Sequence, residues 1–273
     1  RKRITALLLA GALALGLLPG TAWAEEGGTT SLPEFESWES MGTDKAFKIS
    51  SEESLKALAN EVKDDDASGT YNMSGITFYL ANDITLSSDW TPIGNVAYPS
   101  DGFAGTFDGN GHTISGMNIN SSSSGGVGLF GTINGATIKN LKVEGTVSAT
   151  KSGYVGGIVG KTSGTVTIER CSFSGSVQSS KTGVNAGAGG IIGRVNSGSV
   201  CVSGCANTAD IRGGAAAGIL GYCSANGTSI ENCYSTGTIS GSNRAGGIVG
   251  QVYSTTPIRN CFTTSDAISG FNG

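Results

Sequence analysis

The stretch Gly157-Ile158-Val159-Gly160 decides the fold of this chain, because close variants of it recur at nearly regular intervals. Each copy, here called a box, places two bulky apolar residues between two glycines. The boxes are Gly128-Leu129-Phe130-Gly131, Gly157-Ile158-Val159-Gly160, Gly190-Ile191-Ile192-Gly193, Gly218-Ile219-Leu220-Gly221 and Gly247-Ile248-Val249-Gly250. Their closing glycines are 29, 33, 28 and 29 residues apart, which is long enough for one supersecondary unit and too short for a domain. Such a period predicts a solenoid, a propeller or another stacked array.

Three further apolar positions recur at fixed distances from the box. An anchor follows each box by about ten residues: Leu141, Cys171, Cys205, Cys233 and Cys261. Three residues before the anchors lie Ile138, Ile168, Val202, Ile230 and Ile258, and six after them lie Val147, Val177, Ile211, Ile239 and Ala267. The residues between are mainly Ser, Thr, Asn and Gly, which suit short strands and corners. The sequence therefore predicts an all-β chain with one coil per repeat over residues 126–273, a parallel β-helix whose tight corners use many of its 45 glycines.

The residues before the repeats predict a cap for the first coil. Ser50 and Glu53 are expected to form a capping box, after which Leu55, Leu58 and Val62 lie on one face of a short helix. A solenoid needs such a cover, since its first coil exposes an apolar interior and an unpaired strand edge. Residues 47–125 are therefore expected to hold this capping helix and the first strands of the β-helix.

The N-terminal residues indicate export. Arg1-Lys2-Arg3, an apolar run and Ala22-Trp23-Ala24 are typical of a secretory signal peptide over residues 1–24, and the run is too short and too interrupted for a membrane anchor. Residues 25–46 are acidic and predict a flexible leader. The sequence stops within a repeat, so we expect further protein downstream.

These features resemble a known family of bacterial proteins. The stretch from Phe103 to Gly116, which contains Asp108-Gly109-Asn110-Gly111-His112, is followed by the boxes as in the GLUG-repeat proteins of bacterial cell surfaces. The approach from Met41-Gly42-Thr43 to Leu58-Ala59 is similar to theirs as well, and the resemblance covers about residues 42–270. It implies a right-handed parallel β-helix in a large, adhesin-like exported protein. Cysteine at four of the five anchors is a departure from the family.

The six cysteines do not have the arrangement of a disulfide framework. Four of them share the position that Leu141 fills, which predicts a buried file of small apolar thiols. Cys223 is expected to point inward and Cys201 falls in a strand. Bridges between adjacent coils stay open as an alternative, because a coil spacing of about 4.8 Å lies within the Cα separation of a disulfide. Zinc is disfavoured, because a vertical file of ligands does not form a tetrahedron.

Few residues in the sequence are candidates for catalysis or metal binding. Asp64-Asp65-Asp66 is interpreted as a solvated turn rather than a calcium site, and the Asp108 loop lacks the glutamate of an EF-hand. His112, the sole histidine, has no evident nucleophile or orienting partner. Glu169 and Glu231 hold matching repeat positions, but they are expected two coils apart, about 10 Å, which is too far for a retaining glycosidase and marginal for an inverting one.

Charge is distributed unevenly along the chain. Its net charge is −4, yet residues 113–273 carry ten bases and five acids. Lys139, Lys142, Lys151, Lys161 and Lys181 either keep the coils soluble and their edges unpaired, or attract an anionic glycan or mucin. Nucleic acid is not expected as a partner.

Together these observations predict an exported cell-surface β-helix module with a structural or adhesive role. We expect no catalytic site, cofactor or metal, and host or environmental glycans or surface proteins are possible partners. The alternatives are a carbohydrate-active β-helix, a non-catalytic segment of a large surface enzyme (glycosidase, lyase or peptidase), and a spacer that holds a downstream domain away from the cell wall.

Overall fold

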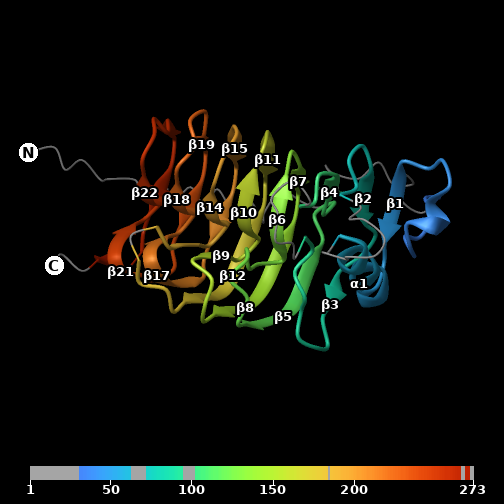
Figure 1. Cartoon of the computed structure of the whole chain (residues 1–273), viewed down its shortest axis with the longest axis horizontal. Coiled ribbons are helices and arrows are strands. Elements are labelled where there is room, and N and C mark those ends of the chain that lie inside the picture. The colour runs from blue at the N-terminus through green and yellow to red at the C-terminus, as the bar shows by residue number, and fades with distance from the viewer. Residues whose placement is uncertain (1–30, 63–71, 95–101, 184, 266–267, 271–273) are drawn as a thin grey trace, which may run out of the picture.

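The computed structural model describes residues 31–62, 72–94, 102–183, 185–265 and 268–270. Its strands stack in parallel from coil to coil along one axis, and the one α-helix among the described residues lies near β1, at the blue end of the stack (Figure 1). The predicted all-β parallel solenoid is thereby confirmed. The expected signal peptide, residues 1–24, lies outside the described residues. Within the described ranges, no helix is long and apolar enough to cross a membrane.

Three parallel sheets run along the solenoid. Sheet 1 contains eight strands: β1 (Ala46–Ile49), β2 (Thr77–Leu80), β4 (Thr106–Asp108), β7 (Thr137–Lys139), β11 (Val166–Glu169), β15 (Val200–Ser203), β19 (Ser229–Glu231) and β23 (Ile258–Arg259). Sheet 3 contains five: β6 (Phe130–Asn134), β10 (Val159–Ser163), β14 (Ile192–Val195), β18 (Leu220–Cys223) and β22 (Val249–Val252).

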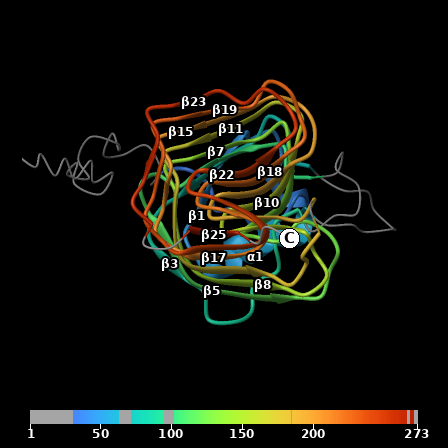
Figure 2. The same cartoon turned by 90° about the vertical axis from the view of Figure 1, so that its left-hand side faces the viewer.

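Sheet 2 is the largest, and most coils contribute more than one strand to it. Its strands are β3 (Ile84–Thr85), β5 (Thr113–Ser121), β8 (Lys142–Ala149), β9 (Tyr154–Gly156), β12 (Ser172–Ser179), β13 (Gly187–Gly189), β16 (Ala206–Asn207), β17 (Asp210–Ala217), β20 (Tyr234–Ser235), β21 (Ile239–Gly246), β24 (Phe262–Thr263) and β25 (Ile268–Gly270). Viewed from the end, sheets 1 and 2 form opposite sides and sheet 3 lies between them (Figure 2).

The boxes stack in the register that their spacing predicts. The second apolar residue of each box opens a strand of sheet 3, and Phe130 pairs in turn with Val159, Ile192, Leu220 and Val249. The first four of these residues are fully buried, and so are Leu129, Ile158, Ile191 and Ile219 beside them. Both apolar residues of a box therefore fill the interior.

The box glycines are needed for close packing and not, as we expected, for the conformation of tight turns. None of them adopts a positive φ angle. A Cβ atom on Gly190 would overlap Asn207 Oδ1 and the carbonyl oxygen of Gly218, and one on Gly193 would overlap the backbone of Val155. Neighbouring backbone comes so near at these positions that only glycine fits.

Positive φ angles occur instead in Gly135, Gly164, Gly198 and Gly227, between sheets 3 and 1, and in a second file of residues at the corner between sheets 1 and 2. The residues of this second file immediately precede the anchors: Asn140, Arg170, Gly204, Asn232 and Asn260, with φ between 50° and 61°. Asparagine and glycine tolerate this conformation better than other residues. The corner therefore has a sequence signal of its own, which the anchor pattern alone does not reveal.

Helix α1 (Glu52–Glu61) caps the first coil as predicted, although its N-terminus differs in detail. Leu55, Leu58 and Val62 are fully buried. The capping box is formed by Ser51 and Ser54, not by Ser50 and Glu53: Ser51 Oγ accepts from the Ser54 amide, and Ser54 Oγ accepts from the Ser51 amide. The helix follows β1 and lies beside β3, where it takes the place of a strand of sheet 2 (Figure 1).

The segment expected to be a flexible leader, residues 25–46, packs against the first coil in its second half. The short helix η1 (Glu39–Met41) lies here, and the Phe35 amide donates to the Lys48 carbonyl at 3.0 Å. The Phe35 ring is fully buried, edge-on to the rings of Phe47 and Phe78. The acidic composition concealed this aromatic contact, so the expectation of flexibility was wrong from about residue 34 onward.

The other repeated apolar positions are inward as predicted, with two differences in the last coil. Ile138, Ile168, Val202 and Ile230 are fully buried, whereas Ile258 is 47% exposed. Ile239 pairs with Ile268, one residue beyond the position expected for Ala267, which itself lies outside the described residues.

Candidate binding site around Tyr154

The acidic residues considered for catalysis are stacked on sheet 1 and paired with bases. Asp108 pairs in register with Lys139, and Lys139 with Glu169. Lys139 Nζ lies 3.2 Å from Asp108 Oδ2, Glu169 forms an ion pair with Arg170, and Arg259 lies 2.9 Å from Glu231. Ser203 separates Glu169 from Glu231, as predicted. These acids are therefore parts of a surface charge ladder.

His112 has a simple role at a turn. Its Nδ1 lies 3.2 Å from Asp83 Oδ1, which also accepts from the Thr113 amide at 2.8 Å. That amide hydrogen bond, more than the imidazole, holds the pKa of Asp83 below its usual value. Asp64-Asp65-Asp66 lies outside the described residues. Among the residues that are described, no three His, Cys, Asp or Glu side chains lie close enough to hold a metal ion.

The predicted cysteine file is present, and all six cysteines are free thiols. Cys171, Cys205 and Cys233 are buried in file with Leu141, whereas Cys261, which was also predicted to be buried, is only partly buried. Each thiol donates to a carbonyl of the preceding coil, as from Cys205 to Ile168 at 3.6 Å, and the Cys205 amide donates to Cys233 Sγ at 3.4 Å. Burial raises the pKa of Cys205 well above its ordinary value. Cys223 is buried and Cys201 lies in a strand, β15, as expected; the Cys201 side chain is exposed.

A second row of polar side chains lies on sheet 3, at the position that follows the closing glycine of each box. In register the row reads Thr132, Lys161, Arg194, Tyr222 and Gln251. Side chains alternate between the two faces of a strand, so the residue that follows Arg194, Val195, points into the interior of the coil and is buried. Coil stacking therefore brings a lysine, an arginine and a tyrosine into adjacent positions.

Tyr154 joins this row from β9. Its ring lies 4.8 Å from Arg194 Cζ and 5.8 Å from Lys161 Nζ. Arg194 Cζ lies 4.7 Å from the ring of Tyr222, which in turn lies 5.5 Å from that of Tyr253. The Arg194 guanidinium is thus in contact with two tyrosine rings, and cation–π attraction to the ring faces stabilises it there.

Lys161 is unusual because it is nearly buried beside another cation. The side chain belongs to a residue only 9% exposed. Burial, and secondarily the charge of Arg194, lowers the pKa of its ammonium group. Among the described residues, neither Lys161 nor Arg194 has an acidic partner, and Arg194 Nε and Thr132 Oγ1 are buried without a hydrogen bond.

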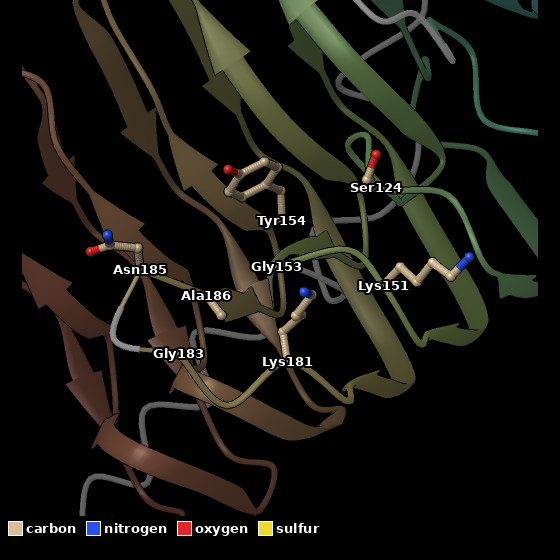
Figure 3. A pocket seen from close by; sticks show the side chains of 8 residues that line it. All are labelled: Ser124, Lys151, Gly153, Tyr154, Lys181, Gly183, Asn185 and Ala186. Atoms are coloured by element: carbon tan, nitrogen blue, oxygen red, sulfur yellow. The ribbon is translucent and has the colours of Figure 1, made fainter.

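Tyr154 also lines an open pocket of about 430 Å³. Lys151 and Lys181, from the corresponding loops of two consecutive coils, project at its edge, and Ser124 and Asn185 complete the polar lining (Figure 3). Residues 145–168 and 170–209 contain no Asp or Glu. Positive charge therefore concentrates around Tyr154 without acids nearby in sequence to neutralise it.

The sequence revealed this site only in part. Lys151 and Lys181 line the pocket with Tyr154, and Lys161 lies over the Tyr154 ring, but Lys139 pairs with Asp108 and Lys142 lies on β8 of sheet 2. Arg194 and the tyrosines were not identified. A signal was present, since Lys161, Arg194 and Tyr222 each follow the closing glycine of a box.

Comparisons with known proteins agree with this architecture. Residues 151–178 match the family described as "The GLUG motif". Over 127 residues, 44% of the chain, the sequence is 31% identical to halomucin from Haloquadratum walsbyi, and this stretch is only 1% of the halomucin length. The fold is similar to that of a crystal structure from Bacteroides ovatus named as "a putative immunoglobulin A1 protease". The TM-score is 0.61 at 21% identity, over 82% of this chain and 67% of the other.

Proposed function

We propose that the chain, a β-solenoid in which residues 151–178 match the GLUG motif, is a surface-exposed, exported module with a structural or adhesive role and no catalytic site of its own. The observation that carries this proposal is the uniform stacking of the coils. Strands of successive repeats pair in parallel in all three sheets, with register shifts in the β5–β8 and β17–β21 pairs of sheet 2. A stack of this kind projects a long, repetitive surface, as solenoid proteins that bind partners do.

The chemistry of the surface supports a non-catalytic role. Asp108, Glu169 and Glu231 are neutralised by neighbouring bases on the same sheet. A glycosidase needs two carboxyl groups that face each other across a substrate, with one of them kept protonated. The paired acids of sheet 1 suit a solvated ladder instead.

Surface labelling tests the location, and a binding assay tests the adhesive role. Antibodies against the chain should label intact, unpermeabilised cells that produce it, and protease treatment of those cells should remove the label. Purified chain on beads should bind a glycan-coated or protein-coated surface saturably. A chain that is found only after cell lysis refutes the surface location, and release of products from a bound glycan refutes the absence of catalysis.

The solved structure from Bacteroides ovatus favours a second candidate, a non-catalytic solenoid segment of a larger surface peptidase. In that case the solenoid holds or presents the substrate and another part of the same polypeptide cleaves it. The complete reading frame decides between the two: a peptidase domain in the same frame supports the second candidate, and its absence there favours the first.

A further inference from the structure

We propose that the site around Tyr154 binds the carboxylate groups of an acidic polysaccharide, with Arg194 and Lys161 as the direct partners. The inference rests on the proposed adhesive role and names the class of ligand. Arg194 and Lys161 come from successive coils and meet only through the stacking, each at the position that follows the closing glycine of its box.

The guanidinium of Arg194 is positioned to bind a planar anion. Tyr154 and Tyr222, at 4.8 and 4.7 Å, contact the group and restrict its rotation. Its Nε atom is buried without a hydrogen bond. An arginine held in this way retains in-plane N–H donors, whose fork geometry matches the two oxygens of a carboxylate.

Lys161 provides a second, unneutralised charge at the same place. It is adjacent to Arg194 in register and only 9% exposed, and its Nζ atom lies 5.8 Å from the ring of Tyr154. Holding two cations together away from water is unfavourable, and a bound anion removes this cost. The buried Thr132 Oγ1 is adjacent to Lys161 in register and supplies a further unused hydroxyl.

The surroundings favour a sugar polymer over a peptide. The pocket beside Tyr154 is lined by hydroxyl and amide groups, from Ser124 and Asn185, and by two more lysines. Neutral polar groups suit the hydroxyls of a sugar, whereas docking of an amphipathic peptide needs a continuous apolar groove. Lys151 and Lys181 lie on consecutive coils, so the site offers charges to more than one acidic unit along the axis.

The test uses the whole purified chain and three probes: polygalacturonate, which carries carboxylates, dextran sulfate, which carries sulfates, and neutral dextran. Affinity is measured by calorimetry at physiological and at raised salt. Arg194→Gln and Lys161→Gln remove the proposed partners, and Arg194→Lys keeps the charge but loses the planar fork. Arg212→Gln, at an exposed position of β17 in sheet 2, is the matched control for the loss of one positive charge.

The wild type should bind polygalacturonate and not dextran. Arg194→Gln, Arg194→Lys and Lys161→Gln should each weaken binding about tenfold, as expected for loss of a charged hydrogen bond, whereas Arg212→Gln should change it less than about twofold. Circular dichroism identifies any variant that fails to fold, and the other two then carry the test.

Equal effects of the site variants and the control overturn the inference but leave an adhesive role elsewhere on the chain. Binding of dextran sulfate alone overturns the assignment of a carboxylate. If none of the probes binds, the inference is wrong, while surface labelling of intact cells still decides the proposed location independently.

Discussion

Replacement of Gly190 by alanine provides the sharpest test of how the boxes determine the fold. The added methyl group would overlap the side-chain oxygen of Asn207 and the carbonyl oxygen of Gly218, the equivalent glycine of the next coil. The carbonyl oxygen of Gly218 can move away from the methyl group only if the next coil moves with it. Asn207 can retreat only by giving up hydrogen bonds to Ala209 and Ser235 in a fully buried environment.

These contacts set the size of the effect. Overpacking costs about 1–3 kcal/mol. Displacing the buried Asn207 amide from its partners adds roughly 1–3 kcal/mol. We therefore expect Gly190→Ala to lower the free energy of unfolding by about 4 kcal/mol. Gly183→Ala is the matched control, since its methyl group would meet no atom within 4 Å, and its effect should stay within about 0.5 kcal/mol.

Urea denaturation followed by far-ultraviolet circular dichroism measures both variants against the wild type. The denaturation midpoint should fall clearly for Gly190→Ala at an unchanged slope, and it should not fall for Gly183→Ala. Equal midpoints for the two alanine variants would refute the argument that close backbone approach, and not turn conformation, requires the box glycines.

Three other expectations can be checked directly. Iodoacetamide should modify Cys201 in the folded chain but leave Cys205 unmodified until denaturant is added, because burial raises the pKa of the Cys205 thiol and blocks access of the reagent. Labelling is measured by mass spectrometry, and equal labelling of the two cysteines contradicts the buried file. Asn232→Ala should lower stability by about 1 kcal/mol at its left-handed position, whereas Asn232→Gly should not, as thermal melts will show. Glu52 has its pKa lowered to about 2, first by Lys56 and then by the Ser87 hydroxyl. A carboxyl group whose pKa is lowered by folding stabilises the folded state above its unfolded pKa of 4.5, and this contribution disappears as pH falls toward 2. Glu52→Gln should therefore have a lower melting temperature than the wild type at pH 7, and the two melting temperatures should become equal near pH 2.

The register between coils could be predicted because residues at the same repeat position occupy the same place in every coil of a stacked structure. Phe130, Val159 and Ile192 pair as their positions in the boxes require, and the anchor Cys205 follows Leu141 into the interior. A pattern of this kind depends only on distances along the chain, which the sequence contains in full.

Other features depend on contacts between coils and could not be derived from spacing alone. The role of Gly190 became evident only with Asn207 placed against it, and the burial of Phe35 depends on rings from β1 and β2. In the same way, the contacts of Arg194 with the rings of Tyr154 and Tyr222 arise only when the coils stack. The candidate site is thus a product of the period and of which residue each coil happens to carry after its box.

The capping helix α1 makes the two ends of the coil stack different. It takes the place of a strand beside β3, so this end of sheet 2 presents a helix surface where an incoming strand would otherwise pair. Each later coil, by contrast, offers a ready strand edge to the coil that follows it in the chain. A later coil can therefore form against the strand edges of the coil before it, whereas α1 blocks strand pairing at the β3 end of sheet 2.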